Sequence, residues 1–122
     1  MQRVLIVDDQ MGIRLLLKEV LEEEGYTVKE AHNGELALHM VEEWTPEIFI
    51  IDMRLPGIDG LTLLKELQSI SRLEGACMII MTAFGEKEQV EAARQNGAAY
   101  YITKPFDIEN LKSVIGKVSR EG

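Results

Sequence analysis

The sequence is poor in cysteine, proline and basic residues. Of its 122 residues one is cysteine, three are proline, and 13 are lysine or arginine against 21 aspartate or glutamate. A single cysteine excludes an internal disulfide, and the apolar run around Cys77 predicts a buried, inert thiol. The formal net charge of −8 opposes binding to nucleic acid or anionic lipid, because its electric field repels both.

The sequence also lacks a long hydrophobic run. No apolar segment approaches the roughly 20 residues that cross a membrane, and Met1-Gln2-Arg3 leads directly into a strand pattern. These absences predict neither a signal peptide nor a transmembrane helix. With 46% hydrophobic residues, residues 1–122 have the size and composition of one domain with one core. We expect a cytoplasmic monomer.

Two short apolar runs end on acids. Ile48–Ile51 stops on Asp52, and Val4–Val7 stops on Asp8 and Asp9. Continuous apolar runs of this length are typical of strands buried on both faces, as in a parallel sheet. Each acid would then stand at the carboxyl end of its strand, where open α/β sheets bind ligands.

Strand and helix patterns alternate five times along the chain, without a linker or a low-complexity tract. This alternation predicts a doubly wound α/β sandwich, a flavodoxin-like (βα)5 fold with the parallel strand order 2-1-3-4-5. The segment at 27–31 is only half apolar and suits an edge strand, and the polar helix at 86–96 is the most weakly anchored. The expected strands lie at 4–7, 27–31, 48–52, 77–81 and 99–102, and the expected helices at 13–21, 37–44, 63–70, 86–96 and 108–118.

The predicted strand order brings the acids together. Its switch point lies between the first and third strands, which are the two that end on Asp8, Asp9 and Asp52. Three adjacent carboxylates repel one another unless a cation lies among them, and oxygen ligands at a shallow rim suit Mg²⁺. His32 and His39 lie away from this rim and are read as exposed polar residues, so zinc is not expected.

A metal held by carboxylates suggests phosphoryl transfer. Asp52 is the predicted nucleophile, since it stands alone at the end of the central strand and an aspartate can form an acyl phosphate. Lys104 would supply a positive charge to the phosphoryl oxygens, and Thr82 and Ala83 would supply hydrogen bonds through a hydroxyl and an N–H group. A lone lysine or threonine at a strand end is usually an ordinary loop residue. The prediction depends on the joint placement of Asp8-Asp9, Asp52, Thr82-Ala83 and Lys104-Pro105 at strand ends.

Four motifs in register resemble the receiver domain of two-component response regulators, over essentially the whole chain. They are Val7-Asp8-Asp9, the segment from Ile51 to Gly60, Met81-Thr82-Ala83 and Lys104-Pro105-Phe106. The resemblance implies a signalling phosphoacceptor, and not a classical enzyme, that takes a phosphoryl group from a phosphohistidine of a sensor histidine kinase. No residues of this sequence remain for an output domain, although a receiver cut from a longer transcriptional regulator would look the same.

The resemblance also implies roles for individual residues. Asp9, Asp52 and the backbone carbonyl of Arg54 would hold Mg²⁺, with Asp8 acting through water. Thr82 and Tyr101 would be the coupled switch residues, although Tyr101 can also be read as a static residue at the sheet edge. Lys104-Pro105 would be a cis peptide. Side chains at Arg54 and Phe84, two residues after Asp52 and Thr82, would modulate hydrolysis of the phosphoryl group.

A narrower resemblance concerns the partner. The segments 8–14 and 104–108 are similar to single-domain regulators of sporulation phosphorelays, which pass the phosphoryl group to a histidine phosphotransferase. The apolar residues of the first helix span about 140°, wider than the usual stripe of about 100°. We therefore predict a docking patch for a helical histidine protein, although its apolar members could equally be core. The patch consists of Gln10, Gly12, Ile13, Leu16, Pro105 and Phe106.

Three other functions fit part of the pattern. An FMN carrier shares the predicted fold, but Asp8 and Asp9 would repel the FMN phosphate. A phosphatase of the haloacid dehalogenase type also uses an aspartate nucleophile, but a second acid is expected where this chain has Arg54. A degenerate receiver would serve only to bind proteins, although every acidic and phosphate-contacting position is filled here.

Overall fold

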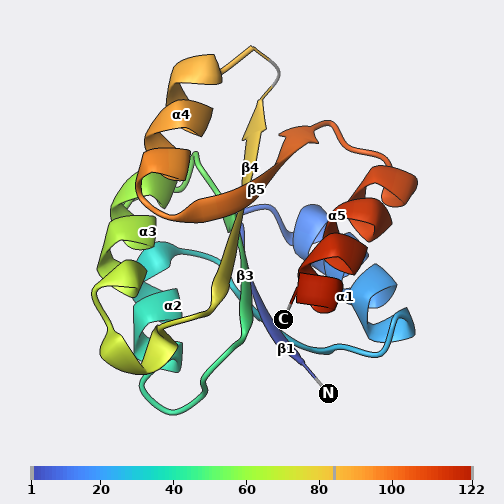
Figure 1. The fold of residues 1–122 in the computed structure, drawn as a ribbon, viewed down its shortest axis with the longest axis horizontal. Helices are drawn as coiled ribbons and strands as arrows, with labels where there is room; N and C mark the ends of the chain where they lie inside the picture. Colours follow the sequence, from blue (N-terminus) through green and yellow to red (C-terminus); the bar gives the residue numbers. More distant parts are fainter. Residues whose placement is uncertain (1, 84, 122) are drawn as a thin grey trace.

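The computed structural model describes residues 2–83 and 85–121, and these residues contain a parallel sheet of five strands in the order β2-β1-β3-β4-β5. The strand order and the fold class predicted from the sequence are therefore confirmed (Figure 1). The half-apolar strand β2 lies at one edge and β3 at the centre, as expected. The strands are β1 (Arg3–Val7), β2 (Thr27–Ala31), β3 (Ile48–Asp52), β4 (Cys77–Ala83) and β5 (Ala98–Lys104).

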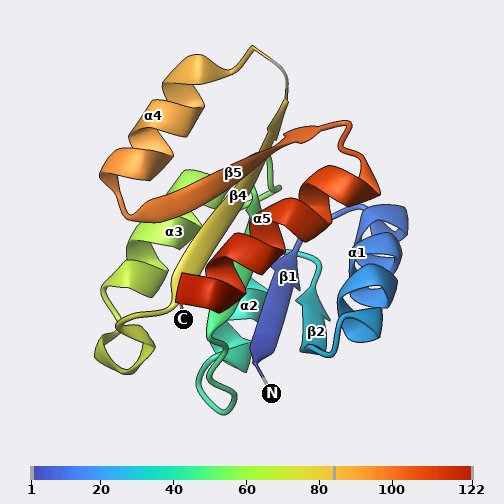
Figure 2. The same ribbon diagram turned by 45° about the vertical axis from the view of Figure 1, so that its right-hand side comes forward.

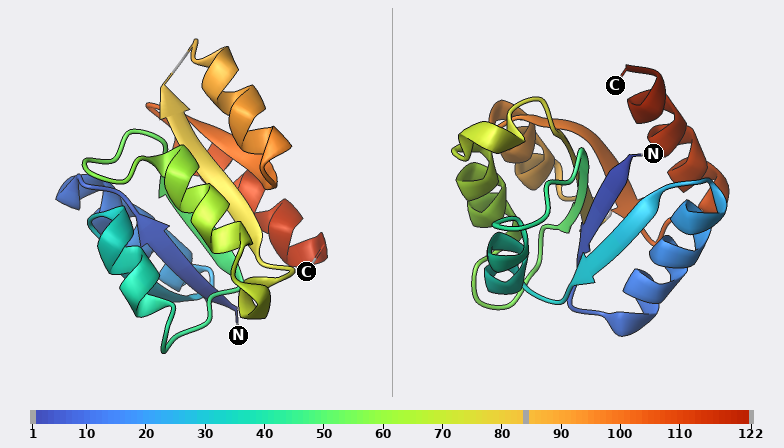
Figure 3. Two further views of the ribbon diagram at one scale, coloured as in Figure 1. Left: turned by 90° about the vertical axis from the view of Figure 1, so that its left-hand side faces the viewer. Right: turned by 90° about the horizontal axis from the view of Figure 1, so that it is seen from below.

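Helices cover both faces of the sheet. Figures 1 and 2 show α1 and α5 on one face, and α2, α3 and α4 on the other. The views from the side and from below in Figure 3 show the sheet between these two layers. The helices are α1 (Met11–Glu23), α2 (Gly34–Met40), α3 (Gly60–Gln68), α4 (Lys87–Gln95) and α5 (Ile108–Glu121), with a short 3-10 helix, η1 (Ser71–Leu73), after α3.

Alternate residues of the inner strands fill the core of the domain as two hydrophobic clusters, one on each face of the sheet. In β3, Phe49 and Ile51 pack toward α2 and α3, whereas Ile48 and Ile50 pack toward α1 and α5. All five residues of β3 are buried, which explains the continuous apolar run that ends on Asp52. The buried strand thus gives its terminal carboxylate a firm support at the carboxyl edge of the sheet.

Local capping explains where several helices begin. The side chains of Asn33, Asp59 and Asp107 accept hydrogen bonds from backbone N–H groups in the first turns of α2, α3 and α5. Helix α4 has no side-chain hydrogen bond from its N-cap residue, Glu86. Ala93 is the one buried residue of this helix. The weak burial predicted for this helix is therefore observed.

Two expectations from the sequence are wrong. Helix α2 ends at Met40, and the chain continues to Trp44 through turns, because the N–H groups of Glu42 and Glu43 bond three residues back. Cys77 is only partly buried, since it is the first residue of β4 and lies at the end of the sheet opposite the acids. Within the described residues, no helix is long and apolar enough to cross a membrane.

Candidate functional site

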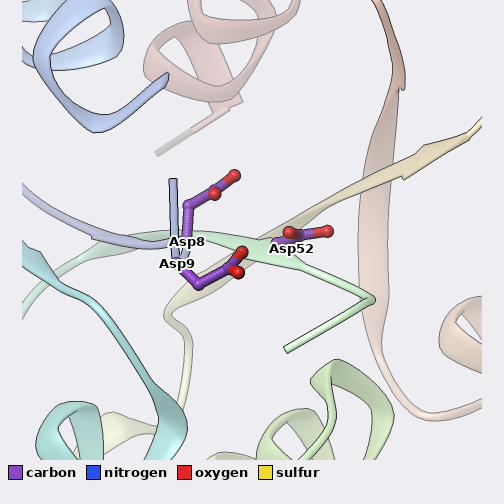
Figure 4. Close-up of side chains that lie close together, drawn as sticks. All are labelled: Asp8, Asp9 and Asp52. Carbon is purple, nitrogen blue, oxygen red and sulfur yellow. The ribbon is translucent and has the colours of Figure 1, made fainter. Parts of the chain in front are cut away.

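The three acids singled out in the sequence meet at the carboxyl edge of the sheet. Asp8 and Asp9 directly follow β1, and Asp52 is the last residue of the neighbouring strand β3 (Figure 4). One carboxylate oxygen from each lies within 4.8 Å of the others. Asp8 and Asp52 are buried and Asp9 is exposed. The cluster is therefore buried at Asp8 and Asp52 and open to solvent at Asp9.

Lys104 joins this cluster from the end of β5. Its ammonium group donates a hydrogen bond to Asp8 Oδ2 at 2.7 Å and another to Asp52 Oδ2 at 3.3 Å. The following peptide bond, Lys104–Pro105, is cis, as the family resemblance implied. Three carboxylates thus face a single ammonium group, which leaves two negative charges uncompensated when all of these groups are ionised.

Burial and neighbouring charges shift the protonation of two of these groups. Burial raises the pKa of the Asp52 carboxyl, and the charge of Asp8 adds to the rise, against the opposing effects of the Arg54 N–H and of Lys104. Desolvation acts to lower the pKa of Lys104. Its hydrogen bond to Asp8 and the charge of Asp52 outweigh that effect, so the pKa of Lys104 is raised. The ammonium form of Lys104 is therefore secured by the acids around it.

Backbone and side-chain contacts hold the loops that carry the acids. The Gln10 N–H donates to Asp8 Oδ1 at 2.8 Å, and the guanidinium of Arg14 donates to the Asp8 carbonyl at 2.8 Å and to Glu30 at 2.7 Å. On the other strand, Gly60 lies so close to the chain that a Cβ there would collide with the Asp52 carbonyl. These contacts fix where Asp8 and Asp52 stand.

Thr82 and Tyr101 line one cavity beside the acids. Thr82 is buried near the end of β4, and its hydroxyl donates a 3.5 Å hydrogen bond to the Ala83 carbonyl. Tyr101 is 54% exposed, so its ring is not packed in the core in this structure. The cavity has a volume of about 420 Å³ and lies beneath the start of α4. Its lining comprises Thr82, Ala83, Gly85, Glu86, Lys87, Val90, Tyr101 and Thr103.

The residues of the predicted docking patch differ in exposure. Leu16 is 39% exposed, and Gln10, Gly12 and Pro105 are also exposed. Ile13 and Phe106 are partly buried and pack against the core beneath α1 and α5. The patch is therefore an exposed rim around two residues that also belong to the core.

The structure also places near the site two residues that the sequence analysis did not single out. Arg14 anchors the loop after β1, and Glu86, the residue before α4, forms a 2.6 Å ion pair with Arg54. Glu86 is 32 positions from Arg54 in the sequence, so no local sequence pattern predicts this contact. Phe84, which the family resemblance also implicates, lies outside the described residues.

This fold with an acid cluster and a lysine at one sheet edge defines the class of protein. Residues 4–116 match the response regulator receiver domain, so the chain belongs to the response regulator receiver family. The family inferred from the motifs is confirmed.

Particular relatives place the chain more closely. It is 41% identical over 116 residues to sporulation initiation phosphotransferase F of Bacillus subtilis, a match that covers 95% of this chain and 92% of the relative. It is 36% identical to the chemotaxis protein CheY of the same organism, with 94% and 95% covered. Among solved structures, CheY4 of Vibrio cholerae matches with a TM-score of 0.91 at 27% identity, covering 97% of this chain and 98% of that one.

Proposed function

We propose that this protein is a cytoplasmic phosphoryl carrier of a two-component phosphorelay, with Asp52 as the acceptor. Asp52 would receive the phosphoryl group from a phosphohistidine of a sensor histidine kinase and pass it to a histidine phosphotransferase. The observation that carries the proposal is the position of Asp52, at the end of a buried strand and within hydrogen-bonding reach of Lys104. The similarity to a sporulation phosphotransferase supports the phosphorelay.

The charges of the site fit a bound divalent cation. Asp8, Asp9 and Asp52 offer three carboxylates against one ammonium group, and the open side at Asp9 leaves room for water ligands. Asp9, Asp52 and the backbone carbonyl of Arg54 would hold Mg²⁺, with Asp8 acting through water. When bound, Mg²⁺ would neutralise charge on the transferring phosphoryl group.

The chain's own groups would perform the rest of the transfer. A carboxylate oxygen of Asp52 attacks phosphorus, the P–N bond to the donor imidazole breaks, and the imidazole leaves with the bonding electrons. Lys104, held in its ammonium form, moves from the carboxylates to a phosphoryl oxygen. The Thr82 hydroxyl and the Ala83 N–H donate hydrogen bonds to the other oxygens.

The cavity beside Thr82 provides a route for the response. When the Thr82 hydroxyl turns toward the phosphoryl group, the exposed ring of Tyr101 can move into the space that both residues line. Ala93 is the only buried residue of α4, so this helix can move with little loss of buried contacts. The proposal therefore includes Thr82 and Tyr101 as the coupled switch.

The exposed rim around Ile13 and Phe106 is the proposed docking patch for a helical histidine protein. Leu16 and Pro105 present apolar surface from α1 and from the loop after β5. Leu16→Ala should slow transfer between protein partners without changing phosphorylation by a small donor. Equal transfer rates for the variant and the wild type would contradict the docking role of Leu16.

The direct test is incubation with acetyl phosphate and Mg²⁺, followed by intact mass measurement. We expect one phosphate-sized adduct in the wild type and none in Asp52→Ala. Asp59→Asn is the matched control, because Asp59 is an exposed aspartate of the next loop and asparagine also caps helices well. An absent adduct in the wild type, or an adduct that survives Asp52→Ala, would overturn the proposal.

A second candidate is the receiver domain of a longer transcriptional regulator. The regulatory protein AtoC of Escherichia coli is 35% identical to this chain, but the match covers only 24% of AtoC. Transfer from the phosphorylated protein to a histidine phosphotransferase separates the candidates. Rapid and reversible transfer supports the phosphorelay carrier, whereas a phosphoryl group that only hydrolyses favours the receiver of a longer regulator.

A further inference from the structure

An ion pair joins the loop after β3 to the loop that leads into α4. The guanidinium of Arg54, in the loop after β3, lies 2.6 Å from Glu86 Oε1, in the loop that leads into α4. The Arg54 side chain is 72% exposed, whereas the Glu86 side chain is only 14% exposed. Arg54 is therefore the solvent-exposed partner of the pair, and Glu86 is the partner packed against the protein.

Glu86 is placed where its carboxylate has few other uses. It is the residue before the first turn of α4, yet its side chain makes no capping hydrogen bond there. Its second oxygen, Oε2, is buried without a hydrogen-bond partner among the described residues. A buried carboxylate with an unsatisfied oxygen is costly, so the carboxylate depends on its contact with Arg54. This links the start of α4 to the loop of the nucleophile.

Arg54 is also adjacent to the reacting group. Its backbone N–H donates to Asp52 Oδ1 at 3.1 Å, which ties its main chain to the acceptor carboxylate. A phosphoryl group on Asp52 would add negative charge and several acceptor oxygens there. Guanidinium groups bind phosphate oxygens in a bidentate manner, so such a group would compete with Glu86 for the Arg54 side chain.

We propose that the Arg54–Glu86 ion pair is a latch that opens on phosphorylation, when the Arg54 guanidinium exchanges the Glu86 carboxylate for the phosphoryl group. Glu86 is then a positioning residue, because it acts on the reaction through Arg54. The exchange leaves the start of α4 without its tie to the loop after β3. This inference rests on the proposed phosphoacceptor function of Asp52 and adds a regulator of the same site.

The reaction used to test the latch is phosphorylation by acetyl phosphate. The bond between the acetyl oxygen and phosphorus breaks, acetate leaves with the bonding electrons, and a bond forms between an Asp52 carboxylate oxygen and phosphorus. No proton or further reactant is required. While Arg54 is paired with Glu86, its guanidinium is not free to bind the phosphoryl group. Arg54 can therefore stabilise the transfer only after it leaves Glu86.

The rate of phosphorylation by acetyl phosphate should be measured in a double-mutant cycle of Glu86→Gln, Arg54→Gln and the combined variant. Glu86→Gln should raise the rate roughly two- to five-fold, the size expected for releasing an ion pair whose arginine is exposed. The same substitution should have no such effect when Arg54 is already glutamine. Arg54→Gln keeps the backbone carbonyl and N–H at this position, so the main-chain roles proposed for Arg54 are preserved.

The cycle separates the latch from simple repulsion, since removing any acid near the site favours an anionic donor. Glu88→Gln is the matched control, because Glu88 is an exposed glutamate in the first turn of α4. If Glu86→Gln accelerates phosphorylation equally with and without Arg54, or no more than Glu88→Gln does, the latch is overturned.

Hydrogen exchange gives a second readout that does not depend on the rate. The Val90 amide donates to the Glu86 carbonyl at 3.2 Å. Exchange of this amide and of those that follow it in α4 should quicken when the wild type is phosphorylated, and to a similar extent in unphosphorylated Glu86→Gln. Unchanged exchange in both would contradict the latch. If the wild type gives no adduct on Asp52, the proposed function itself fails. If the adduct forms but the cycle shows no coupling, only the latch fails.

Discussion

Strand β3 and helix α4 border the same site but are held very differently. All five residues of β3 are buried and its four apolar residues contribute to the core on both faces of the sheet, whereas Ala93 is the one buried residue of α4. Val90 and Ala92 of α4 are partly buried, and Tyr101, which lines the cavity beneath the helix, is more than half exposed. The buried apolar surface is therefore concentrated beneath Asp52, the proposed nucleophile.

The difference between these regions suggests a division of labour. The proposed nucleophile must be held in one place, and a strand packed on both faces holds Asp52 in this way. A responding element must change its contacts at low cost, and a helix with little buried surface can do so. Substitutions near β3 should therefore mainly lower the stability of the fold. Substitutions near α4 should mainly weaken the conformational response to phosphorylation.

The largest effect on stability is expected at the centre of β3. Ile50→Ala should lower the free energy of unfolding by about 2–5 kcal/mol, because Ile50 is fully buried and its truncation leaves a cavity. Urea denaturation monitored by circular dichroism measures the change. A loss below about 1 kcal/mol would mean that β3 is not the rigid support of the site.

The next effect concerns the cation. At ten times its dissociation constant, Mg²⁺ should raise the free energy of unfolding by about 1.4 kcal/mol, since it binds the folded chain. Asp9→Asn should abolish most of this gain, while the variant without Mg²⁺ should be about as stable as the wild type, because Asp9 is exposed. An equal gain from Mg²⁺ in the wild type and in Asp9→Asn would place the ion elsewhere.

A smaller, pH-dependent effect is expected at Asp52 in a buffer that contains a chelator. Because burial raises the pKa of Asp52 in the folded state, the folded protein holds this proton more tightly than the unfolded chain does. The contribution of Asp52 to stability therefore falls as the pH rises from its ordinary value of 3.8 through the folded-state pKa. Asp52→Asn should be more stable than the wild type at pH 7.

Acidification should remove this advantage. When the pH falls below 3.8, Asp52 becomes protonated in both states and asparagine no longer offers an electrostatic gain. Urea titrations of both proteins at neutral and acidic pH measure the difference. An advantage of Asp52→Asn that does not change with pH would show that its origin is packing, and a loss at neutral pH would contradict the raised pKa.

The smallest effect is expected at Tyr101. Tyr101→Ala should change the free energy of unfolding by less than about 0.5 kcal/mol, because the side chain is 54% exposed. Tyr100→Ala is the matched control and should cost more, since Tyr100 packs against the core on the other face of β5. If Tyr101→Ala is the more destabilising of the two, the tyrosine is a static packing residue and not a switch.

Much of the fold could be predicted from the sequence, because the signals are local. The run Ile48–Ile51 marks a strand buried on both faces, and the alternation of patterns leads to the order of the sheet. Once this order is known, Asp8, Asp9 and Asp52 must share one edge. The clustering of these acids therefore follows from strand ends, which are local, together with a general rule for parallel sheets.

Other features could not be predicted in this way. The end of α2 at Met40 and the partial exposure of Cys77 depend on how turns and strand ends pack, and the apolar residues in the sequence pointed the other way. The supports of the site were also missed. Arg14 reaches Glu30 on a neighbouring strand, and its basic side chain carries no signal of that partner.

The sequence by itself thus determined the class of fold, the acid cluster and the identity of the candidate nucleophile, because hydrophobic period and strand ends are properties of short segments. Only the tertiary structure decided how that nucleophile is surrounded. The Arg54–Glu86 pair and the cavity shared by Thr82 and Tyr101 join residues that are far apart in the chain. Such contacts depend on the three-dimensional path of the backbone, which no local pattern encodes.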